Sequence, residues 1–145
     1  MTKEPLYRLT KHITFLEAEL KDYEEFESLS WNEYNKDRSK RRDVERWVEN
    51  IINSSIDIAK IIINVEGISL ADTYKETVVL LSLVPGFDKN EVESLSGWIK
   101  LRNIISHEYL DIRWSSIKKF ISETKPLYEG FLNRVRRYIE IKAKS

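Results

Sequence analysis

Apolar residues recur every three or four positions along most of this chain, which is the period of an amphipathic helix. The first stripe predicts a helix from about residue 5 to residue 29, and Pro5 suits its first turn because no N–H is needed there. The apolar members of this stripe are Leu9, Ile13, Leu16, Leu20, Tyr23 and Phe26. Polar residues at 30–36 then interrupt the pattern.

A second stripe predicts a long helix from about residue 38 to residue 66. The run 61–63 is three isoleucines, which alone would favour a strand. The longer helical period prevails over this local preference, and Gly67 is a plausible helix terminator. The apolar line consists of Val44, Val48, Ile51, Ile52, Ser55, Ile58, Ala59 and Ile62.

Three further helices are predicted beyond Gly67. Ser69 and Asp72 form a pattern like a capping box, and Tyr74, Val78 and Leu81 continue it as a stripe up to a turn at 85–86. Asp88 and Glu91 predict the next start, followed by the line Val92, Leu95, Trp98, Ile99 and Ile105. The last helix is expected from about 114 to 142, with a kink at Pro126.

The predicted fold is therefore all-α, an up-and-down bundle of four or five helices. With 145 residues, four glycines, three prolines and no visible repeat or linker, the chain is expected to be one domain over residues 1–145. It has no run of 18 apolar residues and no charged-then-apolar leader, so neither a membrane span nor a signal peptide is expected.

Composition narrows the chemistry. The absence of cysteine excludes disulfides, cysteine-ligated zinc and thiol nucleophiles, and it favours a reducing cytoplasm. The 24 basic and 24 acidic residues balance, but the basic ones gather at 36–46 and 134–144, and acidic ones at 17–27. These clusters are either solvated helix faces or a local surface that attracts phosphate.

Residues 102–109, with the sequence Arg-Asn-Ile-Ile-Ser-His-Glu-Tyr, hold one of only two histidines. Histidine exchanges protons near neutral pH, and the arginine guanidinium is well shaped to hold phosphate oxygens. Together Arg102 and His107 suggest acid–base chemistry on a phosphodiester, and we expect the substrate to be RNA.

On one regular helix Arg102 and His107 project about 140° apart, because five steps turn about 500°. Either the helix ends near Ser106 and turns His107 back, or two copies of the chain meet and pool their arginines and histidines. Ser106 and Tyr109 follow Arg102 by four and seven residues, so they share its face if the helix continues.

Arg102, His107 and Tyr109 match the Arg-x4-His-x-Tyr signature of the HepT toxins, in the HEPN superfamily of helical ribonucleases. The resemblance extends from about residue 38 to residue 139. One departure is Glu108, where the family often has aspartate. Residues 44–46 and 55–59 are similar to the family's second helix, and residues 101–103 are similar to its active-site helix.

The resemblance implies a homodimer whose two motifs face one another in a cleft and cleave RNA without a metal ion or other cofactor. It also implies a partner, an MntA-like nucleotidyltransferase antitoxin that transfers adenosine monophosphate to the motif tyrosine. Carried over to this chain, Arg102 and His107 are catalytic and Tyr109 is the AMPylation site.

Metal-free RNA cleavage needs a base for the 2′-hydroxyl, an acid for the leaving 5′-oxygen and a cation for the phosphorane. We expect Arg102 to hold the phosphate and His107 to act as base or acid, with two copies dividing the roles. Asn103 and Ser106 are expected to orient the histidine or contact RNA. Nucleotide phosphates on Tyr109 would repel those of RNA, which accounts for neutralisation.

Other interpretations remain open at this point. His107 can simply end a helix, where a cation complements the dipole. His12 is expected to be structural, and the adjacent pair His107 and Glu108 lacks the ligand spacing of a metal site. Trp114 follows the motif closely enough to reach RNA. The protein can also be a catalytically silent adaptor subunit of a nucleotidyltransferase, or a plain dimeric scaffold.

Overall fold

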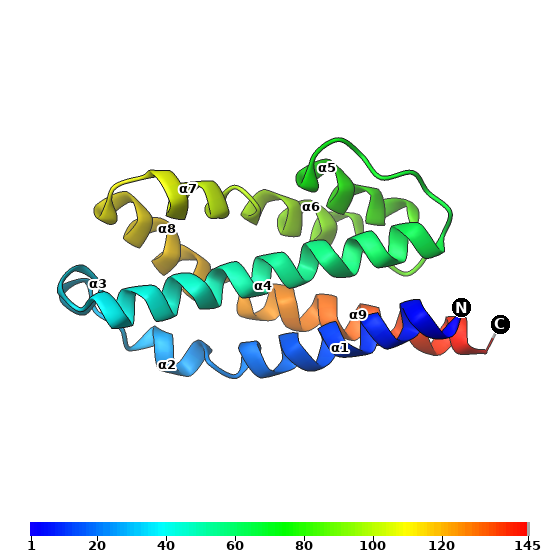
Figure 1. The fold of residues 1–145 in the computed structure, drawn as a ribbon, viewed down its shortest axis with the longest axis horizontal. Coiled ribbons are helices and arrows are strands. Elements are labelled where there is room, and N and C mark those ends of the chain that lie inside the picture. The colour runs from blue at the N-terminus through cyan, green and yellow to red at the C-terminus, as the bar shows by residue number, and fades with distance from the viewer. Residues whose placement is uncertain (145) are drawn as a thin grey trace.

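The computed structural model describes residues 1–144, which fold into a bundle of helices (Figure 1). This confirms the predicted all-α class. The α-helices are α1 (Lys3–Leu20), α2 (Tyr23–Glu27), α3 (Trp31–Lys36), α4 (Arg38–Val65), α5 (Tyr74–Val79), α6 (Lys89–Trp98), α7 (Leu101–His107), α8 (Leu110–Glu123) and α9 (Lys125–Ala143), and the 3₁₀ turn η1 (Leu80–Leu83) follows α5.

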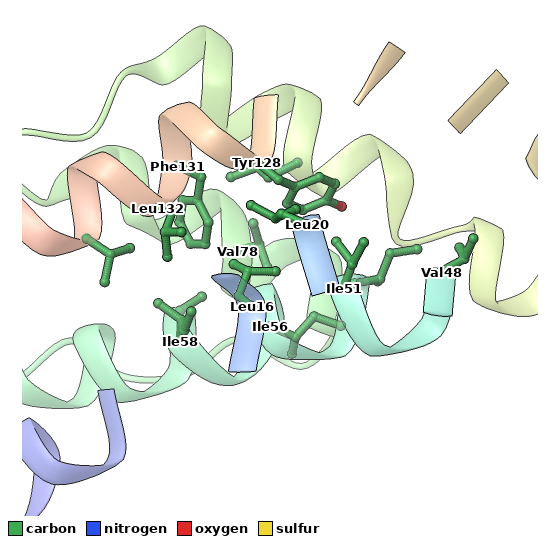
Figure 2. Close-up of a cluster of buried hydrophobic side chains, with 14 of the residues drawn as sticks. Leu16, Leu20, Val48, Ile51, Ile56, Ile58, Val78, Tyr128, Phe131 and Leu132 are labelled. Carbon is green, nitrogen blue, oxygen red and sulfur yellow. The ribbon is translucent and has the colours of Figure 1, made fainter. Parts of the chain in front are cut away.

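Helix α4 is the spine of the bundle. In Figure 1 it crosses the centre of the molecule, with α5, α6 and α7 on one side and α1 and α2 on the other, and both termini lie at one end. Helices α1 and α9 pack against each other, and α1 also packs along α4. Figure 2 shows the core between them, built from Leu16, Leu20, Val48, Ile51, Ile56, Ile58, Val78, Tyr128, Phe131 and Leu132.

The long first helix that was predicted is broken in the structure. Helix α1 ends at Leu20, and the chain turns before α2 begins at Tyr23, although the whole predicted stripe is buried. A local and a tertiary contact meet at this break: the Glu19 carbonyl accepts from the Asp22 N–H at 3.1 Å and from the indole of Trp47 at 2.7 Å, which satisfies an oxygen at the end of α1. Tyr23 then turns into the core and bonds Thr124 at 2.6 Å.

The region 30–36 is a short helix and not the interruption that was predicted. Ser30 and Glu33 form a capping box, in which the Glu33 N–H donates to the Ser30 hydroxyl and the Ser30 N–H to the Glu33 carboxylate, both at 3.1 Å. These reciprocal bonds satisfy free N–H groups at the start of α3. The helix buries the ring of Tyr34 completely.

The prediction for α4 is confirmed at both ends. Asp37 caps its start by accepting from the N–H groups of Ser39 and Lys40. At its end Gly67 has φ of +71°, and Ile68 N–H donates to the Ile63 carbonyl at 3.0 Å. This is the Schellman arrangement, in which glycine takes the left-handed conformation at low cost.

The predicted start of the third helix is wrong. Thr73, not Ser69, caps α5, because its hydroxyl accepts from the Glu76 N–H at 3.1 Å. The stripe is also partly wrong, since Tyr74 is 47% exposed while Val78 and Leu81 are buried. The ring of Tyr74, in the first turn of α5, is therefore partly exposed to solvent.

The last two predicted helices are each two helices. The fourth breaks at Ile99 and Lys100, so that α7 is separate from α6, and the fifth begins earlier, at Leu110, and breaks at Thr124. Pro126 lies in the first turn of α9 and starts that helix instead of kinking a longer one. The start of α6 is as predicted, since the Asp88 carboxylate accepts from the Asn90 N–H.

Candidate active site on the exposed face of α7

Helix α7 carries four of the five predicted site residues. Its inner side is fixed by Leu101 and Ile105, which are buried in the core. His107 is its last helical residue, because Glu108 adopts extended backbone angles, φ −92° and ψ 163°. The Glu108 N–H still donates to the Ile104 carbonyl at 3.0 Å, which closes the helix end.

The exposed face of α7 is a strip bounded by the two predicted catalytic residues. Arg102 is half-buried at one edge, Asn103 and Ser106 lie exposed between, and His107 is exposed at the other edge. A regular helix places these four within about 140° of arc. Since His107 is still helical, it is not turned back toward Arg102 within one chain, which removes the first of the two geometric alternatives.

The side chains of Asn103, His107 and Tyr109 make no hydrogen bond or ion pair with residues 1–144. Tyr109 is the N-cap residue of α8 and is 82% exposed. The chain has left the helix at Tyr109, so this residue does not share the Arg102 face as a continuous helix would require. Ser106 does share it, and its hydroxyl donates to the Arg102 carbonyl at 3.0 Å.

Arg102 reaches across the bundle toward α5 and α4. Its guanidinium carbon lies 5.1 Å from the centre of the Tyr74 ring, which is a cation–π contact. On α4, burial raises the pKa of Glu49 and the nearby Glu45 carboxylate adds to this, whereas Arg102 and Arg46 pull the pKa of Glu49 down. The Arg102 charge is therefore close enough to α4 to interact with the Glu49 carboxylate.

The turn between α7 and α8 is held by a residue that the sequence analysis missed. Arg113 donates from Nε to the Glu108 carbonyl at 2.7 Å and from a terminal nitrogen to the Glu45 carboxylate at 3.3 Å. The same carboxylate oxygen accepts from the Tyr34 hydroxyl at 2.5 Å, and burial with this bond raises the pKa of Tyr34. Glu108 lies between His107 and Tyr109, so Arg113 fixes the backbone that carries both.

The one available signal for Arg113 was local. It lies in the first turn of α8, five residues after Glu108, and a cation there can fold back on the preceding turn. Its partner Glu45 lies 68 residues away in the sequence, so the bond between Arg113 and Glu45 was not predictable from spacing.

A family model described as "Ribonuclease HepT-like" matches residues 16–135, which include Arg102, His107 and Tyr109. The chain belongs to the HepT-like ribonuclease family. No curated protein matches the sequence.

Two solved structures show the same fold. One is a tri-AMPylated Shewanella oneidensis HEPN toxin in complex with an MNT antitoxin, with a TM-score of 0.77 and 15% identity over 94% of this chain and 99% of that one. The other is described as a toxin–antitoxin with AMP-PNP, with a TM-score of 0.78 and 15% identity over 90% of this chain and 98% of that one. The HepT-like chain therefore has the fold of the HEPN toxins.

The motif face of this HepT-like chain is open surface. A cavity of about 360 Å³ adjoins α7, but Leu101 and Ile104 line it together with Trp98, and Arg102 and His107 do not. Trp114 packs its ring 5.1 Å from that of Tyr34, in an aromatic cluster that also includes Trp31.

Within residues 1–144, no group of three or more histidine, aspartate or glutamate side chains is arranged to hold a metal ion. None of the described helices is long and apolar enough to cross a membrane.

Proposed function

We propose that this HepT-like chain is a ribonuclease that cleaves RNA with Arg102 and His107. The observation that carries the proposal is the strip on α7, where a guanidinium and an imidazole flank two exposed polar side chains and the imidazole has no partner in the described chain. A structural histidine that only ends its helix explains neither the adjacent unpaired Asn103 nor the unpaired Tyr109.

The reaction uses the nucleophile that RNA itself supplies. The 2′-oxygen attacks the adjacent phosphorus, its proton passes to a base, and the bond from phosphorus to the 5′-oxygen breaks as an acid protonates the leaving oxygen. A neutral His107 imidazole is the base, and a protonated one is the acid. Arg102 stabilises the charge that builds on the phosphoryl oxygens. The products are a 2′,3′-cyclic phosphate and a 5′-hydroxyl.

A second copy of the chain completes the site. Arg102 and His107 diverge on α7, so two strips placed across a two-fold axis bring the arginine of one copy toward the histidine of the other. Each copy then contributes one arginine and one histidine, and the two histidines divide the acid and base roles.

Regulation of the toxin is proposed to act at Tyr109. A nucleotidyltransferase antitoxin transfers AMP from a nucleoside triphosphate: the tyrosine oxygen attacks the α-phosphorus, the phenolic proton leaves and pyrophosphate departs. The exposed position of Tyr109 supports this, as does the fold shared with a tri-AMPylated toxin. The added phosphates then lie two residues from His107, where they repel RNA.

The test is expression of the chain alone in a bacterial host, compared with two matched histidine variants. We expect wild type to arrest growth and to cleave RNA when purified, and His107→Ala to do neither. His12→Ala on α1 should behave like wild type, because His12 lies away from the α7 strip. Harmless expression of unmodified wild-type protein would favour the adaptor, and absence of both RNA cleavage and a nucleotidyltransferase partner would leave only the scaffold. Intact mass shows whether the protein already carries AMP.

A further inference from the structure

The ring of Tyr74 lies beside the proposed active site with two cations over it. Arg102 of α7 lies 5.1 Å from the ring centre, and Lys60 of α4 places its ammonium nitrogen 4.5 Å from the same centre. Three separate helices, α4, α5 and α7, thus bring two positive charges and one aromatic ring to a single place on the surface.

Neither of these cations forms an ion pair with the described residues, although Arg102 also acts electrostatically on the Glu49 carboxylate of α4. The ion pairs of the described residues involve Lys40, Arg113, Arg134, Arg136, Arg137 and Lys142, and neither Lys60 nor Arg102 is among them. Each makes its contact with the neutral ring of Tyr74, which is itself 47% exposed. Two like charges that converge on an exposed ring favour an anion with an aromatic part.

We infer that Lys60 and Tyr74 form a nucleotide-binding subsite of the RNA cleft, next to the phosphate that Arg102 holds. Lys60 contacts the adjacent backbone phosphate, and the Tyr74 ring contacts the neighbouring base. Single-stranded RNA is bound in this way by proteins, through basic side chains along its backbone and aromatic rings against its bases. The inference rests on the proposed ribonuclease activity and adds a direction to it, from α7 across α4 toward α5.

The test measures binding of a short fluorescent single-stranded RNA to the His107→Ala protein, which prevents cleavage during the measurement. Lys60→Gln should weaken binding and reduce the slope of log affinity against log salt by about 0.7, the loss of one phosphate contact on a single strand. Tyr74→Leu should weaken binding about tenfold, and Tyr74→Phe, which keeps the ring, should bind almost as wild type does.

The chain offers a matched control on α1. Lys11 lies 5.0 Å from the ring centre of Tyr7, which is also exposed, and this pair reproduces the lysine–tyrosine contact away from the motif. Lys11→Gln and Tyr7→Leu should leave both affinity and salt slope unchanged. The inference is overturned if the Lys60 and Tyr74 variants behave like these two controls.

Cleavage kinetics separate this inference from the proposed function. In the protein with His107 intact, Lys60→Gln should raise KM about tenfold with kcat nearly unchanged, because the subsite binds ground state and transition state alike. If wild type does not cleave RNA at all, the proposed function fails. If wild type cleaves and Lys60→Gln has the kinetics of Lys11→Gln, the ribonuclease stands and only the subsite is lost.

Discussion

The two halves of α4 carry the same arrangement of side chains with different consequences. Toward its start, Glu45 accepts from the Tyr34 hydroxyl at 2.5 Å and pairs with Arg113 at 3.3 Å. At its end, Glu66 accepts from the Tyr138 hydroxyl at 2.6 Å and pairs with Lys142 at 2.8 Å. The two glutamates are about 30 Å apart along the helix. Each is a partly buried carboxylate held by a phenol and a cation.

What differs is the segment that the cations hold. Arg113 also bonds the Glu108 carbonyl, in the turn that carries the motif. Near the end of α4 the turn at Gly86 is held by a cation outside the Glu66 group. This cation is Arg134, which donates to the Gly86 carbonyl at 3.2 Å and forms an ion pair with Glu91 at 3.1 Å. The turn at Gly86 leads into Phe87, whose ring packs in the core. The contacts of Arg113 therefore support the turn that carries the exposed motif, whereas the contacts of Arg134 support packing in the core.

The largest effect should come from removing a cation of the motif strip. Arg102→Ala should lower kcat/KM for RNA cleavage by about 10²- to 10³-fold, the usual loss when one preorganised contact to the transition state is removed. The midpoint of thermal unfolding should change little. Steady-state cleavage assays and thermal unfolding measure the two quantities.

Arg136→Ala on α9 is the matched control for Arg102. Arg136 forms an ion pair with Glu17 on α1, and the two side chains are 40% and 44% exposed. Its removal should cost under about 1 kcal/mol of unfolding free energy and leave cleavage intact. Equal losses of activity in the two variants would show that net charge, and not the placement of Arg102, matters.

The comparison of Arg113 with Arg134 predicts the next effect. Arg113→Ala should lower kcat about 100-fold, because the released turn lets His107 shift and a shift of about 1 Å has a cost of this size. KM should stay near its wild-type value. Arg134→Ala should cost similar stability, about 1 kcal/mol, with unchanged kcat. The measurement is a kinetic series on both variants together with denaturant unfolding. A loss of kcat in both would mean that general loosening of the bundle explains it.

A smaller effect on cleavage is expected at Tyr109. Tyr109→Phe keeps an exposed ring that can stack on an RNA base and removes only the oxygen, so cleavage should stay within about threefold of wild type. The nucleotidyltransferase partner and a nucleoside triphosphate should then fail to add AMP, and growth arrest should persist in its presence. Intact mass of the co-expressed protein checks this. Tyr7→Phe, at another exposed tyrosine, should still be modified and neutralised.

The sequence predicted the helices better than it predicted where they end. Periodicity identified the buried faces because it depends on the chain alone, and Leu16 and Ile51 lie in the core as expected. The breaks depend on contacts between distant residues, such as the Trp47 indole on the Glu19 carbonyl. A capping signal was readable at Ser30 and Glu33, yet the polar composition of that segment outweighed it.

The residues of the site also differ in whether they could be predicted from the sequence. Arg102, His107 and Tyr109 stand close together in one segment, so their spacing was visible, and the family match includes them. Arg113 was not identified, because its role depends on Glu45, 68 residues away. Tyr74 was assigned to an apolar stripe, and only the folded chain brings Lys60 and Arg102 to its ring.

The smallest effect tests the second tyrosine–glutamate–cation group through pH. Burial alone would raise the pKa of Glu66, but hydrogen bonds from Lys142 and Tyr138 outweigh it and the pKa is lowered. A carboxylate with a lowered pKa in the folded state stabilises the fold above its unfolded pKa and loses this contribution as pH falls through the folded value. Glu66→Gln should therefore be less stable than wild type by about 1 kcal/mol at neutral pH.

That difference should shrink as the solution is acidified below the usual carboxyl range, where wild-type Glu66 takes up a proton and resembles the amide. Denaturant unfolding of both proteins across this range gives the difference directly. The Glu66→Gln protein should cleave RNA at neutral pH as wild type does, because the turn that carries the motif is bonded by Arg113 and not by Lys142. A constant difference at every pH would mean that Glu66 acts through packing and not through its charge, and the likeness between the two ends of α4 would then be one of geometry alone.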